Sequence, residues 1–113
     1  MADTVVGQTR GPISAVVAGG ATTSPAIDIG GHRYVGIIVP AEFDGTTITF
    51  TVCGTVDGTY MPLEVAAGTA VSFTTNASSA FSLGTEIIPW RFFKIVCGTA
   101  QTGATTFLVV TKS

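Results

Sequence analysis

The sequence predicts an all-β fold, an antiparallel two-sheet β-sandwich of the jelly-roll type. Apolar and polar residues alternate along short segments, which is typical of half-buried strands. Gly, Pro, Asn and Asp mark turns about every 8–12 residues, the spacing found in sandwiches and barrels. No segment sustains the 3.6-residue period of an amphipathic helix, so we expect little helix.

The composition supports one folded domain over residues 1–113. Of these residues 46% are hydrophobic and only 11% are charged, so a core can form and disorder is disfavoured. Thr, the commonest residue, favours strands, and the 14 glycines favour turns. We expect residues 1–11 to form an N-terminal arm, or a first edge strand that ends at Gly11-Pro12.

The clearest strand covers residues 47–52, where three threonines alternate with three apolar residues. The apolar, inward-facing set is Ile48, Phe50 and Val52. Asp57-Gly58 predicts a tight hairpin. The returning strand at residues 59–65 is expected to place Met61 and Leu63 on one face.

The remaining strands are expected on the same grounds. Residues 33–39 are apolar on both faces, as expected of a central strand. Residues 91–97 and 105–111 form the last two strands, and residues 84–89 form a loop or a single helical turn. The other expected strands are residues 13–18, residues 25–29, a segment starting at Gly68 with Val71 and Phe73 inward, and a short strand with Phe81 and Leu83.

No catalytic, cofactor or metal motif is recognisable. His32 is the only histidine, and we expect a solvated or capping role for it. Cys53 and Cys97 do not match a zinc-site spacing with it. By alternation Cys53 falls on a Thr-rich face and Cys97 on an apolar face, so we expect two free thiols. Asp44-Gly45 and Asp57-Gly58 fit turns better than Ca²⁺ loops.

The charge pattern argues against nucleic acid and membrane partners. The net charge is −2 and the five basic residues are scattered, whereas nucleic-acid binders show a basic stripe. No apolar stretch approaches the roughly 20 residues that span a bilayer. The first residues do not resemble a secretory signal, so we expect synthesis in a cytoplasm.

The interface candidates are apolar or aromatic residues predicted to be exposed. Val5 and Val6 lie in the arm, which could add a strand to a neighbour's sheet. Trp90, Arg91 and Phe92 form an aromatic corner with an arginine, as protein interfaces often do. Trp90 could equally close the end of the core. A chain this poor in charge is expected to bury part of its surface against partners or further copies of itself.

Several phrases resemble small β-sandwich virion proteins of tailed bacteriophages. They are Phe43-Asp44-Gly45-Thr46, the strand at residues 47–52, T-V-D-G-T-Y-M-P-L at residues 55–63, and W-R-F-F-K-I-V at residues 90–96. The resemblance implies a non-enzymatic virion protein, foremost a capsid decoration or cement protein. It would bind the major capsid protein or other virion proteins as a homo-oligomer, and threefold sites on shells suggest a trimer.

The resemblance leaves two alternatives open. One is a tail, baseplate or head–tail connector component. The other is a carbohydrate-binding module, because the hairpin and the late R-F-F-K-I strand are also similar to discoidin-like galactose-binding jelly rolls. The Gly, Ala and Thr of the loops at residues 19–24 and 98–103 weaken the carbohydrate alternative, since such sites use charged or aromatic loops.

Overall fold

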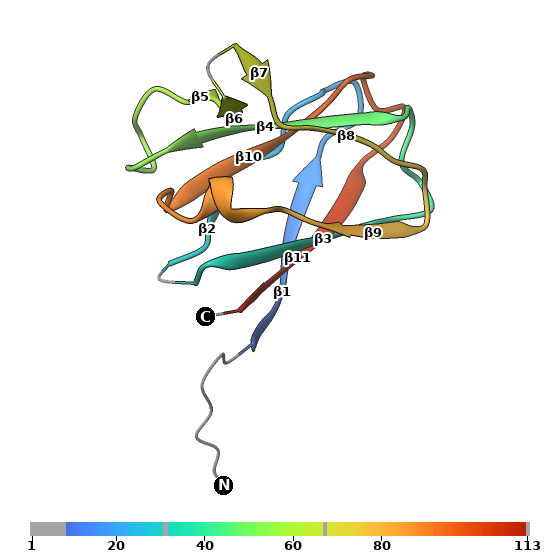
Figure 1. Cartoon of the computed structure of the whole chain (residues 1–113). Coiled ribbons are helices and arrows are strands. Elements are labelled where there is room, and N and C mark those ends of the chain that lie inside the picture. Colours follow the sequence, from blue (N-terminus) through green and yellow to red (C-terminus); the bar gives the residue numbers. More distant parts are fainter. Residues whose placement is uncertain (1–8, 31, 67, 113) are drawn as a thin grey trace, which may run out of the picture.

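Short antiparallel strands make up most of the computed structural model, which describes residues 9–30, 32–66 and 68–112 (Figure 1). Within these ranges there are eleven strands and one 3₁₀ turn. They are β1 (Thr9–Val17), β2 (Ile27–Asp28), β3 (Tyr34–Val39), β4 (Thr47–Cys53), β5 (Met61–Pro62), β6 (Glu64–Ala66), β7 (Thr69–Ala70), β8 (Ser72–Thr74), β9 (Ser79–Ser82), η1 (Thr85–Ile87), β10 (Phe92–Cys97) and β11 (Thr105–Lys112). The predicted all-β class is confirmed.

Nine of the described strands form two facing sheets with jelly-roll topology, and β6 and β7 form a separate two-stranded sheet. Sheet A has the order β1-β11-β3-β9, and sheet B has the order β2-β10-β4-β5 with β8 also paired to β4. The pairs β1·β11, β2·β10, β3·β9 and β4·β8 are all antiparallel, so the first half of the chain runs back along the second half. This long double ribbon is then rolled, and the pairs β3·β11 and β4·β10 close the two sheets.

One hydrophobic core fills the space between the sheets. Phe50 lies at its centre and contacts the rings of Phe73, Phe81 and Phe93 edge-to-face, with centroids 5.9–6.3 Å apart. The burial of β4 alternates along its whole length, with Ile48, Phe50 and Val52 inward, as predicted. The alternation of the sequence therefore identified the inward face of sheet B.

The two cysteines lie at opposite ends of the β4·β10 ladder. Cys53 is paired with Phe92, and Cys97 is paired with Ile48. These two rungs are five residues apart along the strands, so about 16 Å separates the two cysteines. This distance is too long for a disulfide. Both thiols are free, as predicted, and burial raises the pKa of the Cys97 thiol to about 11.

Strand β1 starts earlier than predicted. The expected break at Gly11-Pro12 is wrong, because β1 runs from Thr9 through this pair. Its register with β11 shifts between Arg10 and Ile13, so Pro12 lies in a bulge, where its missing N–H leaves no rung unfilled. Of the predicted arm, residues 9–11 thus belong to the sheet and residues 1–8 lie outside the described residues.

The hairpin after β4 differs from the prediction in its loop and in its returning strand. Residues 54–60 separate Cys53 of β4 from Met61 of β5, so the tight hairpin expected at Asp57-Gly58 is wrong. In place of one strand at residues 59–65, β5 ends at Pro62 and β6 begins at Glu64. Met61 is paired with the inward-facing Val52 but is 60% exposed, whereas Leu63 is buried. Met61 and Leu63 therefore lie on the same face, as expected, but only Leu63 is buried in the core.

A buried amide ties together the loops at one end of the sandwich. Gln101 accepts hydrogen bonds at Oε1 from the Thr105 hydroxyl (2.7 Å) and the Asp44 N–H (3.0 Å). Its Nε2 donates to the carbonyl oxygens of Asp44 (3.0 Å) and Thr99 (2.9 Å). The backbone carbonyl oxygen of Gln101 accepts a hydrogen bond from the Gly20 N–H. The loops after β1, β3 and β10 therefore meet at one residue, with the side chain of Gln101 binding Asp44 and Thr99 and its backbone binding Gly20.

Candidate protein-binding surface

The outward side of sheet A is apolar. We define the apolar face by its outward residues Val16, Tyr34, Ile38, Leu108 and Val110, which lie on β1, β3 and β11. Val16 and Ile38 are each 41% exposed and Tyr34 is 56% exposed. Among the described outward positions of sheet A, Lys112 alone carries a charge. This face is a continuous surface that no described part of the chain covers.

The prediction that residues 33–39 form a central strand is confirmed, since β3 lies between β11 and β9. Its second apolar side, however, is not buried by the described residues, because none of the described elements packs on the outside of sheet A. The sequence signal was an unbroken apolar run within each strand, residues 37–39 of β3 and residues 107–110 of β11, and a central position alone does not explain it. Tyr34, Ile38, Leu108 and Val110 were therefore missed as interface candidates.

Gly36 creates a hollow in the apolar face. The register aligns Val110, Gly36 and Ser82 across three strands, and the missing side chain leaves a gap between Tyr34 and Ile38. Two adjoining depressions of about 280 and 200 Å³ share these three aligned residues. A Cβ at Gly36 would meet only the carbonyl oxygens of Phe81 and Val110, at 3.8 and 3.9 Å. The hollow can accept a small apolar side chain from a partner.

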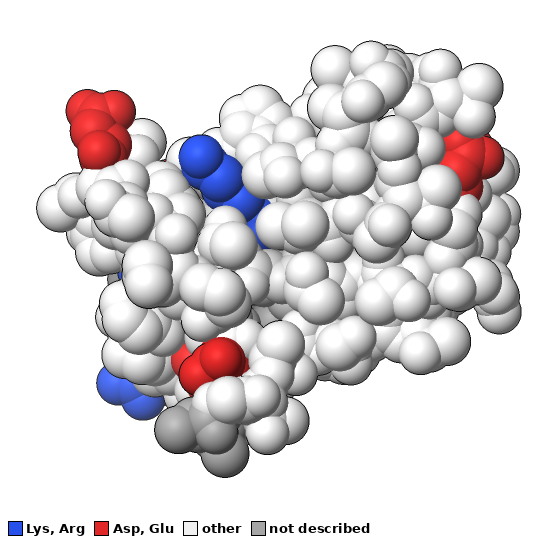
Figure 2. Space-filling view, turned by 90° about the horizontal axis from the view of Figure 1, so that it is seen from above, with Lys and Arg blue, Asp and Glu red and all other residues white. Residues whose placement is uncertain are grey.

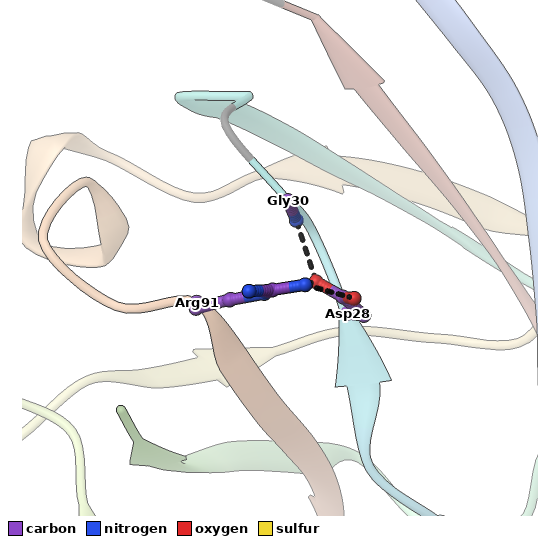
Figure 3. A network of polar contacts seen from close by, with 3 residues as sticks. All are labelled: Asp28, Gly30 and Arg91. Carbon is purple, nitrogen blue, oxygen red and sulfur yellow. Dashed lines mark hydrogen bonds and ion pairs between the residues drawn. The ribbon is translucent and has the colours of Figure 1, made fainter. Parts of the chain in front are cut away.

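The predicted aromatic corner is assembled around an ion pair. Arg91 donates from Nε to Asp28 Oδ1 and from Nη2 to Oδ2, each at 3.1 Å, and the Gly30 N–H also donates to Oδ1 at 2.7 Å (Figure 3). The Arg91 guanidinium lies 5.1 Å from the centroid of the Phe92 ring. Asp28 raises the pKa of Arg91. Arg91 is thus engaged within the chain, which holds the edge strand β2 against β10.

The other predicted interface residues have different settings. Trp90 is partly exposed, and its backbone N–H donates to Ile87 at 3.0 Å, which ends the turn of η1. Phe92 is half-buried on β10. Val5 and Val6 lie outside the described residues. Of the three corner residues, Arg91 and Phe92 are therefore in contact, and Trp90 directly precedes them at the end of the η1 turn.

The outward side of sheet B differs from the apolar face. It presents the hydroxyls of Thr47, Thr49 and Thr51 along β4. Along β10 it presents Lys94 between the apolar residues Phe92 and Val96. The Lys94 ammonium lies 4.3 Å from the centroid of the Tyr60 ring. From this side, charged side chains appear as isolated spots on a largely uncharged surface (Figure 2). No single-sign charged patch forms on the face in view.

The histidine and the possible metal ligands do not form a site within the described residues. His32 Nδ1 lies 2.8 Å from the hydroxyl of Thr111, so His32 pairs with a buried polar group of β11. Within the described ranges, no three metal-ligating side chains gather in one place. The described part of the chain also contains no helix long and apolar enough to cross a membrane.

The comparisons with known proteins identify a shared fold. No protein-family model matches the sequence, and no curated protein matches it. A solved structure, the crystal structure of SPBc2 prophage-derived protein YomS, is similar with a TM-score of 0.60. The match covers 98% of this chain and 100% of that chain at 16% sequence identity. The chain therefore shares its whole architecture with a prophage-derived protein.

Proposed function

We propose that this chain is a non-enzymatic structural protein of a phage virion, and that it decorates and stabilises the capsid shell. The observation that carries the proposal is the apolar face of sheet A. Its five outward apolar residues, of which Tyr34, Ile38 and Val110 line the hollow at Gly36, form a surface that a soluble monomer gains nothing from exposing. The shared fold with a prophage-derived protein supports a phage origin.

The physical case concerns many weak contacts. A flat apolar face with few charges fits a broad, relatively featureless partner such as the surface of a shell built from the major capsid protein. Each copy contributes a modest contact, and repetition over the shell makes the sum strong. No nucleic acid, membrane or cofactor enters the proposal, and the working location is the virion.

Binding to undecorated shells tests the proposal. Val110→Lys on the apolar face should weaken binding to shells of the cognate major capsid protein by about tenfold or more, or ~1.4 kcal/mol. Thr49→Lys is the matched control, because Thr49 is also half-buried and outward-facing on a central strand, but of sheet B. Equal effects of the two variants, or no binding by the native chain, would contradict the proposal.

The hollow gives a second, charge-free test. Gly36→Val should fold normally, because its Cβ meets only ordinary contacts, and should still reduce shell binding by filling the space. Co-sedimentation with shells measures the binding, and thermal unfolding checks the fold. Unchanged binding would exclude insertion of a partner side chain at Gly36.

Two other functions remain as alternatives within the same proposal. A tail, baseplate or connector component would use the same apolar face on a different virion partner, and cross-linking in an intact particle would identify it. A carbohydrate-binding module is supported by the partial exposure of Trp90 beside Arg91. Binding on a glycan array that disappears in Trp90→Ala would favour the carbohydrate module.

A further inference from the structure

The edge of sheet A at β1 differs from the other sheet edges. Sheet A ends at β1 and β9, and sheet B ends at β2 and β5. β1 has nine residues, whereas β9 has four and β2 and β5 have two each. Short strands, charges, prolines and bulges are the usual protection of a sheet edge. The bulge and Pro12 protect the first half of β1, but residues 13–17 contain neither charge nor proline.

The open backbone groups of this segment can be assigned from the ladder. The Thr106 N–H donates to Glu42, away from β1, so the rung Val16·Thr106 is not hydrogen-bonded. Because rungs alternate, Ser14·Leu108 is of the same kind. The N–H and C=O groups of Ser14 and Val16 therefore point to the open edge of sheet A.

We infer that this edge binds the same edge of a second copy, with the two β1 strands antiparallel about a twofold axis at Ala15. In this register Ser14 pairs with Val16 of the partner subunit, and the reverse pair follows by symmetry. All four open groups of each copy then find partners, and only the small side chains of Ala15 meet at the axis. The interface is self-complementary, as twofold symmetry requires.

The pairing extends the apolar face across both copies. Directly opposed residues of an antiparallel pair point to the same side of a sheet, so the two apolar faces become one surface on one side of an eight-stranded sheet. This inference goes beyond the proposed function, makes the expected homo-oligomer a dimer in place of a trimer, and rests on the proposed function for its biological use. A dimer would present two adjacent copies of the shell-binding face at once.

Two variants of β1 and one matched control test the inference. Val16→Lys places two like charges beside the axis, and we expect the dimer dissociation constant to rise about tenfold or more. Ser14→Pro removes an N–H that points to the open edge of sheet A and is not bonded to β11. We expect the dimer dissociation constant to rise by a similar factor. Ile38→Lys is the control: Ile38 has the same 41% exposure as Val16 on the same face, but lies on a central strand.

Sedimentation equilibrium over a wide concentration range gives the oligomeric state, and circular dichroism confirms that each variant is folded. The native chain and Ile38→Lys should be dimers, and both β1 variants should be monomers. A native monomer, a native trimer, or equal losses in Val16→Lys and Ile38→Lys would overturn the inference. Shell binding is measured separately: a dimer that does not bind shells contradicts the proposed function alone, and a monomer that binds them contradicts the edge pairing alone.

Discussion

The outer faces of the two sheets follow the same alternation but carry different residues. Sheet B presents Thr47, Thr49 and Thr51 to solvent, whereas sheet A presents Ile38 and Val110 at comparable positions. Thr and Val are both β-branched and both favour strands, so strand formation does not explain the choice. The hydroxyl of Thr binds water and the methyl group of Val does not. The two outer faces therefore differ in polarity, and the proposed function assigns the less polar face, that of sheet A, to the partner.

The largest expected effect tests whether the two faces are assigned correctly. Phe50→Ala should lower the free energy of unfolding by about 3–5 kcal/mol, because Phe50 is buried among three other rings. Thr49→Ala, one residue away on the outer face, should cost less than half as much. Urea unfolding measures both. Equal costs would mean that the inward and outward positions of β4 are reversed.

The next effect concerns the connection between the sheets. Gln101→Ala should cost about 2–3 kcal/mol, because it leaves the Thr105 hydroxyl and the Asp44 backbone without their buried partners. Chemical unfolding measures the loss. Thr99→Ala, an exposed neighbour in the same loop, is the control and should change little. A cost below that of the control would show that Gln101 does not align the loops.

A smaller effect is expected at the corner of sheet B. The coupling energy of Arg91 and Asp28 in a double-mutant cycle should be about 0.2–1 kcal/mol, since both side chains are largely exposed. Arg91→Ala, Asp28→Ala and the double variant supply the cycle, read by thermal unfolding. The coupling should shrink further in high salt. A coupling that salt leaves unchanged would argue against an exposed ion pair.

The smallest expected effect comes from exchanging Val and Thr between the outer faces of the two sheets. Val110→Thr gives sheet A the residue type of sheet B at one position, and should alter the free energy of unfolding by only about 0.5 kcal/mol. Shell binding should nevertheless weaken, because a hydroxyl replaces a methyl group in the covered surface. Thr51→Val is the converse variant and should leave shell binding unchanged. Parallel unfolding and co-sedimentation experiments separate the two effects.

The fold could be predicted from the sequence to the extent that alternation determines it. The strands at residues 47–52, 91–97 and 105–111 alternate clearly, and their inward residues are buried as expected. The start of β1 could not be predicted, because a bulge accommodates Pro12 only through its pairing with β11. The exposure of Met61 likewise depends on how far the facing sheet reaches.

The candidate surface was harder to predict. Arg91 was selected for its position beside aromatic residues, but its carboxylate partner, Asp28, lies 63 residues away in the sequence. The apolar face combines three strands that are distant in sequence, and its hollow depends on the alignment of Val110 and Ser82 beside Gly36. The sequence of one strand shows only that both of its faces carry apolar residues. The register between strands decides which side is left uncovered.

The pairing of the first strand with the last has a consequence for how the chain folds. Thr9 pairs with Lys112, so sheet A cannot be completed until residue 112 has left the ribosome. Contacts between residues this far apart carry a large loop-closure entropy, and proteins dominated by such contacts fold slowly, typically in milliseconds to seconds. During this time the apolar strand β1 has no neighbour. Crowded synthesis of many copies would therefore expose β1 to premature pairing, and the yield of soluble protein should fall as the rate of expression increases.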